Sequence, residues 1–313
     1  MKAENISWKI GGEAGYGIMS SGFMFSKTFT KKGYFVIDGN EYPSLIQGGH
    51  NTFTVRISAK KIHSLSKNIN ILVALDKKTI DMHKEEISYG GYILYDEEDY
   101  NLKEVKKNRK DINYLSVPFL QIIKEINAPK VMRNNVALGA SVAMVDYDIN
   151  VLKTVIKENF SRKGEEVVNL NSRAAEMGFK YVKEKLKNSA PYYLETLKQK
   201  NKLLVTGNDS VFLGGVRSGC KFYAAYPMTP SSSMLHSFAG VENDFNIVTK
   251  HAESELGVIN MAVGASFAGA RAMLATSGGG FSLMNEGLGA AAMTETPIVI
   301  VLCQRPAPAT GLP

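Results

Sequence analysis

The stretch at 225–233 (AYPMTPSSS) constrains the fold of this chain more than any other. It follows a short apolar run, 222–225, so it predicts a strand that ends in a turn. Two prolines fix φ and favour extended geometry at the residues before them, Tyr226 and Thr229, while the serines suit the N-cap of a following helix. We expect the Thr229 hydroxyl to be held rigidly, pointing away from the sheet. Alone, such a turn is more often a plain strand-to-helix connection than a site.

A second element begins at 249–255 (TKHAESE), which opens a long segment of small and apolar residues. The pattern predicts that Glu255 lies in the first turn of a helix, where the macrodipole stabilises a carboxylate. This is the structural interpretation. A functional interpretation rests on the small residues behind it, including Gly264 and Ala265, which would let another helix approach closely. Glu255 would then be desolvated at the mouth of an interface.

A third element follows at 272–276, which predicts a strand. The run Ser277-Gly278-Gly279-Gly280 predicts a turn that needs positive φ or close backbone approach, before a helix over 281–293. The exposed amides of such a turn could hold an anion or a ring edge. A glycine-rich turn by itself is weak evidence for a site.

The unbroken apolar run at 297–303 (PIVIVLC) predicts a fully buried strand. Gln304 and Arg305 stand at its carboxyl end, where ligands gather in open α/β sheets. The arginine is suited to a bidentate pair with a carboxylate, although an ordinary surface arginine is nearly as common.

In this order, the segments resemble the α subunit of the 2-oxoacid:ferredoxin oxidoreductases. The resemblance is carried by Tyr226 to Ser232, by Glu255 with Gly264 and Ala265, by TSGGGFSLM from Thr276, and by Gln304-Arg305. It implies an α/β fold in which 203–313 is the N-terminal part of a parallel-sheet domain that binds the pyrimidine of thiamine diphosphate.

The resemblance also implies roles for individual residues. Glu255 would hydrogen-bond the ring nitrogen of the aminopyrimidine, and Thr229 and Arg305 would hold the carboxylate of the 2-oxoacid. The cofactor-binding set also contains Tyr226, Pro227, Ser277, Gly278 and Gly279. Departures from the family's usual residues occur at Met228 (usually Ile), at Gly279 (usually Pro) and over 306–311. These departures leave the preferred oxoacid open.

The first two hundred residues carry the other half of the resemblance. Residues 10–18 (IGGEAGYGI) lack the glycine spacing of a dinucleotide fingerprint, so a tight strand-to-helix crossover is the simpler interpretation. Together with 38–51 (DGNEYPSLIQGGHN), they resemble the γ domain of the same enzymes, fused here in front of the α domain. Relatives usually have arginine at 47, so Gln47 removes a charge.

We therefore predict three parts. A γ-type α/β domain occupies 1–187, a linker occupies 188–202, and the N-terminal part of the thiamine diphosphate pyrimidine-binding domain occupies 203–313. With 313 residues, of which 44% are hydrophobic and 21% charged, the chain can bury two cores. The missing signal peptide and the lack of any apolar run of ~18 residues favour a cytoplasmic protein without a membrane segment.

Composition limits the metal and partner chemistry. Two cysteines, Cys220 and Cys303, cannot ligate an iron–sulfur cluster alone, and the five histidines lack metal-ligand spacing, so no metal site is predicted here. The net charge of +7 arises in the first 200 residues. Solvated helix faces are its simplest explanation, with an acidic partner such as ferredoxin, or the phosphates of coenzyme A, as alternatives. No nucleic-acid motif is present.

The chain also lacks the Gly-Asp-Gly segment through which the family's β subunit holds magnesium and the diphosphate. The resemblance therefore predicts a hetero-oligomer with a β subunit that carries magnesium, the diphosphate half-site and a four-iron four-sulfur cluster. Thiamine diphosphate would lie between the chains. Because the motif around Thr310 continues further in relatives, we also expect a truncated end, which would leave the strand at 297–303 with an unpaired edge.

The predicted reaction is oxidative decarboxylation of a 2-oxoacid to its coenzyme A thioester, with electrons passed to ferredoxin. The resemblance favours 2-oxoglutarate or a branched-chain acid. One alternative is a non-catalytic assembly subunit or truncated paralogue of such a complex. Another is a thiamine-dependent decarboxylase or transketolase relative that does not use ferredoxin.

Overall fold

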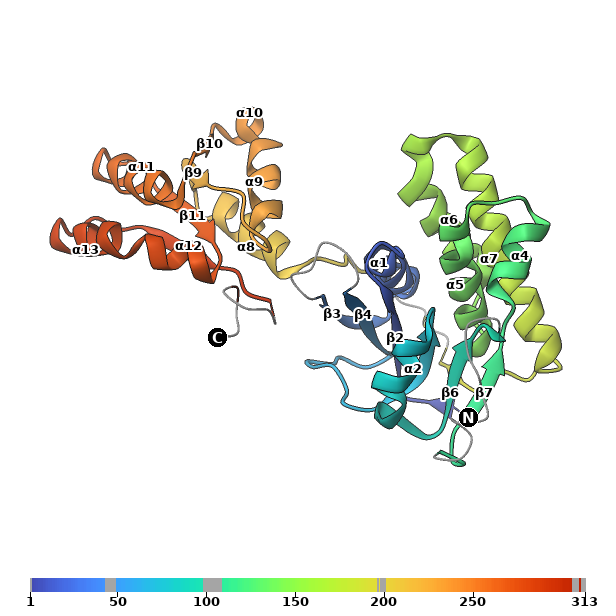
Figure 1. Ribbon diagram of the computed structural model, residues 1–313. Helices are drawn as coiled ribbons and strands as arrows, with labels where there is room; N and C mark the ends of the chain where they lie inside the picture. The colour runs from blue at the N-terminus through green and yellow to red at the C-terminus, as the bar shows by residue number, and fades with distance from the viewer. Residues whose placement is uncertain are drawn as a thin grey trace. The chain divides into compact units, whose positions relative to one another are not determined.

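The computed structural model describes residues 2–42, 49–97, 109–195, 197, 201–305 and 310. They form two compact units, Met1–Leu204 and Val205–Pro313, whose backbone is drawn in Figure 1.

The first unit is built on a six-stranded mixed sheet in the order β3-β4-β2-β5-β6-β7. β4 pairs antiparallel with β2 and β3, whereas β2, β5, β6 and β7 run parallel. The strands are β2 (Asn5–Glu13), β3 (Phe35–Glu41), β4 (His50–Ser58), β5 (Ile69–Ala74), β6 (Ile87–Tyr95) and β7 (Asn113–Ser116). Helices cover both faces, so the central strands are apolar on both sides.

The larger core lies between one face of this sheet and a layer of helices. That layer contains α1 (Ile18–Thr30), α4 (Phe119–Glu125), α5 (Arg133–Met144), α6 (Ile149–Phe160) and α7 (Glu165–Lys185), while α2 (Lys77–His83) packs on the other face. Trp8 stacks on Phe25 at 4.1 Å between ring centroids, and its Nε1 donates to Ser141 Oγ at 2.9 Å. The strand-to-helix crossover predicted at 10–18 is confirmed, because β2 leads directly into α1.

Within that layer, α5 and α7 pack backbone against backbone. All twelve residues of α5 are buried. A Cβ atom on Gly139 would lie 1.8 Å from the carbonyl oxygen of Ala175, and one on Gly178 would lie 2.1 Å from that of Val136. Only glycine fits at either crossing point.

The described part of the segment at 188–202 packs on the first unit. Its strand β8 (Tyr193–Leu194) pairs parallel with β1 (Lys2–Ala3) near the start of the chain. Tyr192 and Leu194 are buried in the larger core, and the backbone N–H of Lys202 donates to the Thr30 carbonyl at 2.9 Å.

The second unit contains four parallel strands in the order β10-β9-β11-β12. They are β9 (Phe222–Ala225), β10 (Val248–His251), β11 (Ala272–Thr276) and β12 (Val299–Leu302). One face of the sheet is covered by α8 (Gly207–Arg217) and α9 (Ser232–Ala239). The other face is covered by α11 (Glu255–Phe267), α12 (Gly278–Leu283) and α13 (Asn285–Met293). The short α10 (Glu242–Phe245) precedes β10. The predicted parallel-sheet domain is confirmed, and all four carboxyl ends meet at one edge of the sheet.

The prediction of a fully buried strand at 297–303 is wrong. In the described chain β12 is the edge strand, paired only with β11, and it leaves Val299 56% and Leu302 41% exposed. An apolar run is typical of a strand covered on both faces, but it does not show whether the covering groups belong to the same chain.

Two local predictions near the site also need correction. The helix predicted over 281–293 is two helices, α12 and α13, and the first begins at Gly278, so the glycine run is helical and none of its residues has positive φ. Ser231 occupies the N-cap of α9, but its hydroxyl donates to the Met228 carbonyl at 2.7 Å instead of capping the helix.

Candidate functional site

The turn after β9 lies at the carboxyl edge of the second sheet. Tyr226, Pro227 and Thr229 are exposed there. Met228 points inward, with its Sδ 3.9 Å from Thr276 Oγ1 at the end of β11. The turn therefore lies beside the residues that follow the neighbouring strand.

Glu255 is the first residue of α11, as predicted, and Ser254 is its N-cap. The Ser254 hydroxyl accepts a hydrogen bond from the Gly257 N–H at 3.3 Å. The Glu255 side chain is only 5% exposed. The partial positive charge of the helix N-terminus therefore lies next to this buried carboxylate.

Gly280, in the first turn of α12, lies directly against that carboxylate. A Cβ atom at this position would lie 2.0 Å from Thr276 Oγ1 and 2.7 Å from Glu255 Oε1. The close backbone approach expected of the glycine run is therefore confirmed at Gly280, whereas its positive φ is not. Thr276 and Ser277 have no exposed surface.

Two polar side chains at this edge of the sheet lack a hydrogen-bond partner within the described parts of the chain. The Ser277 hydroxyl is buried and makes no hydrogen bond, and none reaches the Glu255 carboxylate. Buried polar groups are normally hydrogen-bonded, and those without a partner in the protein are candidates for contact with a ligand. A donor-bearing heteroaromatic ring, such as an aminopyrimidine, would satisfy the Glu255 carboxylate, so this residue fits the predicted cofactor. The Ser277 hydroxyl, in contrast, is fully buried and is not open to a ligand in this structure.

Arg305 follows β12 and is half buried, and its backbone N–H donates to the Thr310 carbonyl at 3.1 Å. The backbone N–H of Cys303 donates to the Thr276 carbonyl at 2.9 Å, which ties the ends of β12 and β11 together. Thr229 and Arg305 thus follow the strands on either side of β11. The structure brings Glu255 and Gly280 into contact, and it places Thr229 and Arg305 at the same edge of the sheet without a direct contact to Glu255 among the described residues.

Sequence reasoning missed three contributors to this edge, namely Asn208, Thr276 and the specific role of Gly280. Asn208 Nδ2 donates to the Pro230 carbonyl and to Ser233 Oγ, both at 2.8 Å. Its contacts lie 22 or more positions away in the sequence, so no local pattern could have indicated them. An asparagine at a helix start is usually explained as a local cap.

The described residues offer no metal centre of their own. No group of three or more His, Cys, Asp or Glu side chains that could hold an ion occurs in them. Burial raises the pKa of the Cys220 and Cys303 thiols, so both stay protonated near neutral pH. The predictions for Gln47 and for residues 306–309 and 311–313 fall outside the described residues.

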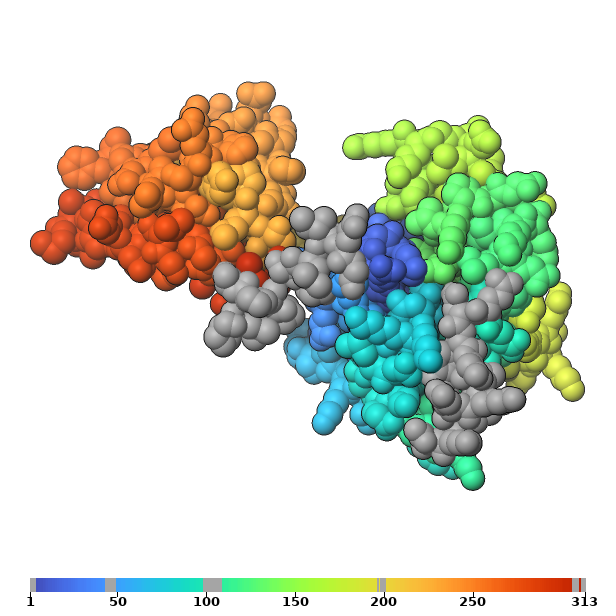
Figure 2. All heavy atoms as spheres, viewed as in Figure 1, coloured from blue at the N-terminus to red at the C-terminus, as the bar shows by residue number. Residues whose placement is uncertain are grey.

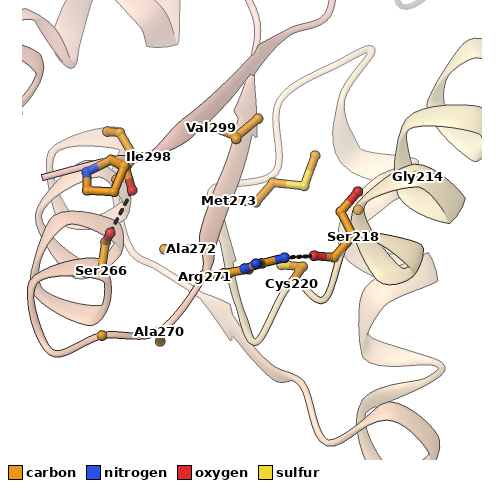
Figure 3. Close-up of a pocket in the computed structure, with 13 residues that line it drawn as sticks. Gly214, Ser218, Cys220, Ser266, Ala270, Arg271, Ala272, Met273, Ile298 and Val299 are labelled. Atoms are coloured by element: carbon orange, nitrogen blue, oxygen red, sulfur yellow. Dashed lines mark hydrogen bonds between the residues drawn. The ribbon is translucent and has the colours of Figure 1, made fainter.

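A separate cavity of about 580 Å³ lies at the opposite, amino edge of this sheet (Figure 3). It is lined mainly by small and apolar side chains where β11 and β12 begin. Arg271 donates to the Ser218 carbonyl there, and Ser266 Oγ donates to the Pro297 carbonyl at 2.6 Å. None of the predicted site residues lines this cavity, so we do not assign the site to it.

The outer face of α11 and α13 is apolar and exposed. Its large side chains are Leu256, Met261, Phe267, Leu288 and Met293, and Phe267 and Met293 are 77% and 86% exposed. In Figure 2, atoms of these orange and red segments form open surface of the second unit. A helix that is apolar on all sides is typically covered on all sides, so this face has the character of an interface.

The fold is that of a protein with two α/β domains, a mixed-sheet unit followed by a parallel-sheet unit that carries a buried carboxylate at a helix start. Comparison with protein families agrees. Residues 7–181 match the family described as pyruvate ferredoxin/flavodoxin oxidoreductase, and residues 214–313 match its thiamine diphosphate-binding domain. The chain belongs to the pyruvate ferredoxin/flavodoxin oxidoreductase family.

Individual relatives agree with this assignment. The chain is 30% identical to a 2-oxoacid:ferredoxin oxidoreductase subunit alpha from Sulfolobus sp, over 98% of this chain and 55% of that one. It is 27% identical to 2-oxoglutarate oxidoreductase subunit KorA from Mycobacterium tuberculosis, over 100% of this chain and 52% of that one. The chain thus spans about half the length of these curated relatives. The predicted resemblance to the α subunits is confirmed.

A solved structure is also similar. It is 2-oxoglutarate:ferredoxin oxidoreductase from Magnetococcus marinus with 2-oxoglutarate, coenzyme A and succinyl-CoA bound, which matches with a TM-score of 0.88 and 32% identity. The match covers 99% of this chain and 54% of that one. Within the described ranges, no helix is both long and apolar enough to span a bilayer.

Proposed function

We propose that this chain is part of a thiamine diphosphate-dependent 2-oxoacid:ferredoxin oxidoreductase. The enzyme would oxidatively decarboxylate a 2-oxoacid to its coenzyme A thioester and pass the electrons to ferredoxin. The observation that carries the proposal is the buried Glu255 carboxylate at the start of α11, packed against Gly280 in the segment that matches the thiamine diphosphate-binding family. The similar structure with bound 2-oxoglutarate and coenzyme A supports 2-oxoglutarate as the substrate, with a branched-chain acid as the second choice.

Thiamine diphosphate supplies the carbanion chemistry of the decarboxylation when it is bound. The role of Glu255 is to accept a hydrogen bond from the protonated ring nitrogen of the aminopyrimidine. The amides of Gly278 and Gly279 would hold the polar edge of the ring, and Tyr226 and Pro227 would contact it from the turn. Ser277, which the resemblance also assigns to this set, is fully buried here and would not reach the ring in this arrangement. Thr229 and Arg305 bind the carboxylate of the oxoacid, so their contribution is orientation.

The proposal includes a β subunit that covers the apolar face of α11 and α13. Gly264 lies on this face, and a Cβ atom there would meet no atom within 4 Å, so there is room for the backbone of another helix. The β subunit would supply magnesium, the diphosphate half-site and the four-iron four-sulfur cluster. The cytoplasmic hetero-oligomer would pass its electrons to ferredoxin as a separate partner.

The test is to co-purify this chain with the β subunit and measure thiamine-dependent reduction of ferredoxin or a viologen dye with coenzyme A across several 2-oxoacids. We expect the Glu255→Gln variant to assemble normally and to lose activity by about 100-fold or more. The matched control is Glu253→Gln, which changes an exposed carboxylate two residues away and should keep wild-type activity. Equal turnover in the Glu255→Gln complex would reject the assignment. A stable wild-type complex without turnover would favour a non-catalytic assembly subunit.

A further inference from the structure

The Asn208 side chain joins three segments that are distant in sequence. Its Nδ2 donates to the Pro230 carbonyl and to Ser233 Oγ at 2.8 Å each, and its Oδ1 accepts from Cys303 Sγ at 3.4 Å. Pro230 lies in the turn after β9, Ser233 lies in the first turn of α9, and Cys303 follows β12. These strands are not neighbours, because β11 lies between them. The carboxamide therefore bridges the carboxyl edge of the sheet.

The bridge is not a by-product of helix capping. The N-terminus of α8 is capped by Thr206 and Asp209, which exchange hydrogen bonds as a capping box. Thr206 Oγ1 accepts from the Asp209 N–H at 3.1 Å, and Asp209 Oδ2 accepts from the Thr206 N–H at 2.9 Å. Because its neighbours cap the helix, the Asn208 side chain is available for its contacts with the two loops.

These contacts match the chemistry of a carboxamide. The –NH₂ group has two protons, and the structure gives them two acceptors, Pro230 O and Ser233 Oγ. The oxygen faces a thiol that burial keeps protonated, so Cys303 is a donor. A carboxylate at position 208 would accept from Cys303 but could not donate to the Pro230 carbonyl.

The bridged segments carry the two residues assigned to the oxoacid carboxylate. Thr229 directly precedes Pro230, and Arg305 lies two residues after Cys303. We propose that Asn208 is a positioning residue that fixes the separation of Thr229 and Arg305 and so sets the fit for the substrate carboxylate. This inference rests on the proposed function.

The test uses the complex with the β subunit and the variants Asn208→Ala and Asn208→Asp, the second of which preserves the size of the side chain. We expect KM for the 2-oxoacid to rise about tenfold, with kcat within about twofold and KM for coenzyme A unchanged. Ser237→Ala, which removes a hydroxyl bond inside α9, is the matched control and should leave all three constants unchanged. An unchanged KM for the 2-oxoacid in a folded Asn208 variant would overturn the inference.

A second readout does not depend on turnover. In a Cys220→Ser background Cys303 is the single thiol, and Asn208→Ala should accelerate its reaction with a disulfide reagent by about tenfold. An unchanged rate would show that the bridge does not cover Cys303 Sγ. The experiment distinguishes failure of the proposed function from failure of the Asn208 inference. A wild-type complex without thiamine-dependent turnover overturns both. Turnover that does not respond to substitution at position 208 overturns the Asn208 inference alone.

Discussion

α5 in the first unit and α11 in the second are helices of similar composition with different surroundings. Both are rich in small residues, and both contain Gly-Ala-Ser, at 139–141 and at 264–266. Every residue of α5 is buried, because it lies between the sheet and α7. α11 is covered by its sheet on one side only and exposes Leu256, Met261 and Phe267 on the other. Composition thus predicts a helix that packs closely, but not whether its partner belongs to the same chain.

The glycines of the two helices show the difference directly. A Cβ atom on Gly139 would lie 1.8 Å from the Ala175 carbonyl oxygen, whereas one on Gly264 would meet no atom within 4 Å. If α11 is the proposed interface helix, Gly264 occupies the place there that Gly139 occupies in α5.

The largest expected effect is on the first helix pair. Gly139→Ala forces the α7 backbone away from α5, and this backbone cannot move without disturbing the core on both sides. We expect the free energy of unfolding of the first unit to fall by about 3 kcal/mol or more, measured by denaturant titration of the chain.

The matched variant for that measurement is Gly264→Ala. Because its added methyl group meets nothing, we expect the free energy of unfolding to stay the same or to rise by up to ~1 kcal/mol from better helix propensity. If both alanine variants unfold like the wild type, the contrast between α5 and α11 does not exist.

The next effect concerns assembly. Gly264→Leu places a large side chain where the proposed partner helix would approach, so it should weaken association with the β subunit by about tenfold or more. The isolated chain should unfold as the wild type does. Titration calorimetry of the two subunits measures the first quantity, and thermal unfolding of the chain alone measures the second.

A control for assembly is Thr154→Leu, which adds an exposed apolar side chain on α6 in the first unit and should leave the affinity unchanged. Equal affinities for the wild type and Gly264→Leu would remove the α11 face from the proposed interface.

The smallest effect is a pH dependence of the first unit. Burial, and the positive charge of His83, Lys78 and Lys9, lower the pKa of His50 below its ordinary 6.5, although Asp76 opposes this. His50 Nε2 lies 2.9 Å from His83 Nε2. Below pH 6.5 the unfolded state therefore binds more protons at this residue than the folded state, so His50 reduces stability as pH falls, and it has little effect above that pH.

The measurement is the difference in melting temperature between pH 7.5 and pH 5.5. His50→Gln should reduce this difference for the first unit, while the exposed His63→Gln should not. A wild-type difference that His50→Gln leaves intact would assign the pH dependence to other groups.

Local signals were sufficient to predict the elements that place the site. The strand at 222–225 and the helix start at Glu255 are both predicted correctly, because caps and apolar runs are local properties of the sequence. The exposure of β12 cannot be predicted in this way, since the burial of an apolar run depends on which groups lie beside it. The break between α12 and α13 was also missed, because both segments have helix-forming residues.

The candidate site also contains some features that the sequence predicts and others that depend on how distant segments pack. The position of Glu255 at a helix start could be predicted from its neighbours in sequence. Its contact with Gly280 could not, since it depends on how α11 and α12 pack together. The bridge from Asn208 to Cys303 spans 95 positions, and only the completed sheet brings these two residues together.

The pairing of β1 with β8 determines when the first unit can be completed during synthesis. Lys2 and Ala3 are synthesised about 190 residues before their partners, Tyr193 and Leu194. At 5 to 20 residues per second, roughly 10 to 40 seconds separate the two segments on the ribosome. Through that interval β1 has no strand to join, so the nascent chain can form most of the six-stranded sheet before β1 is paired.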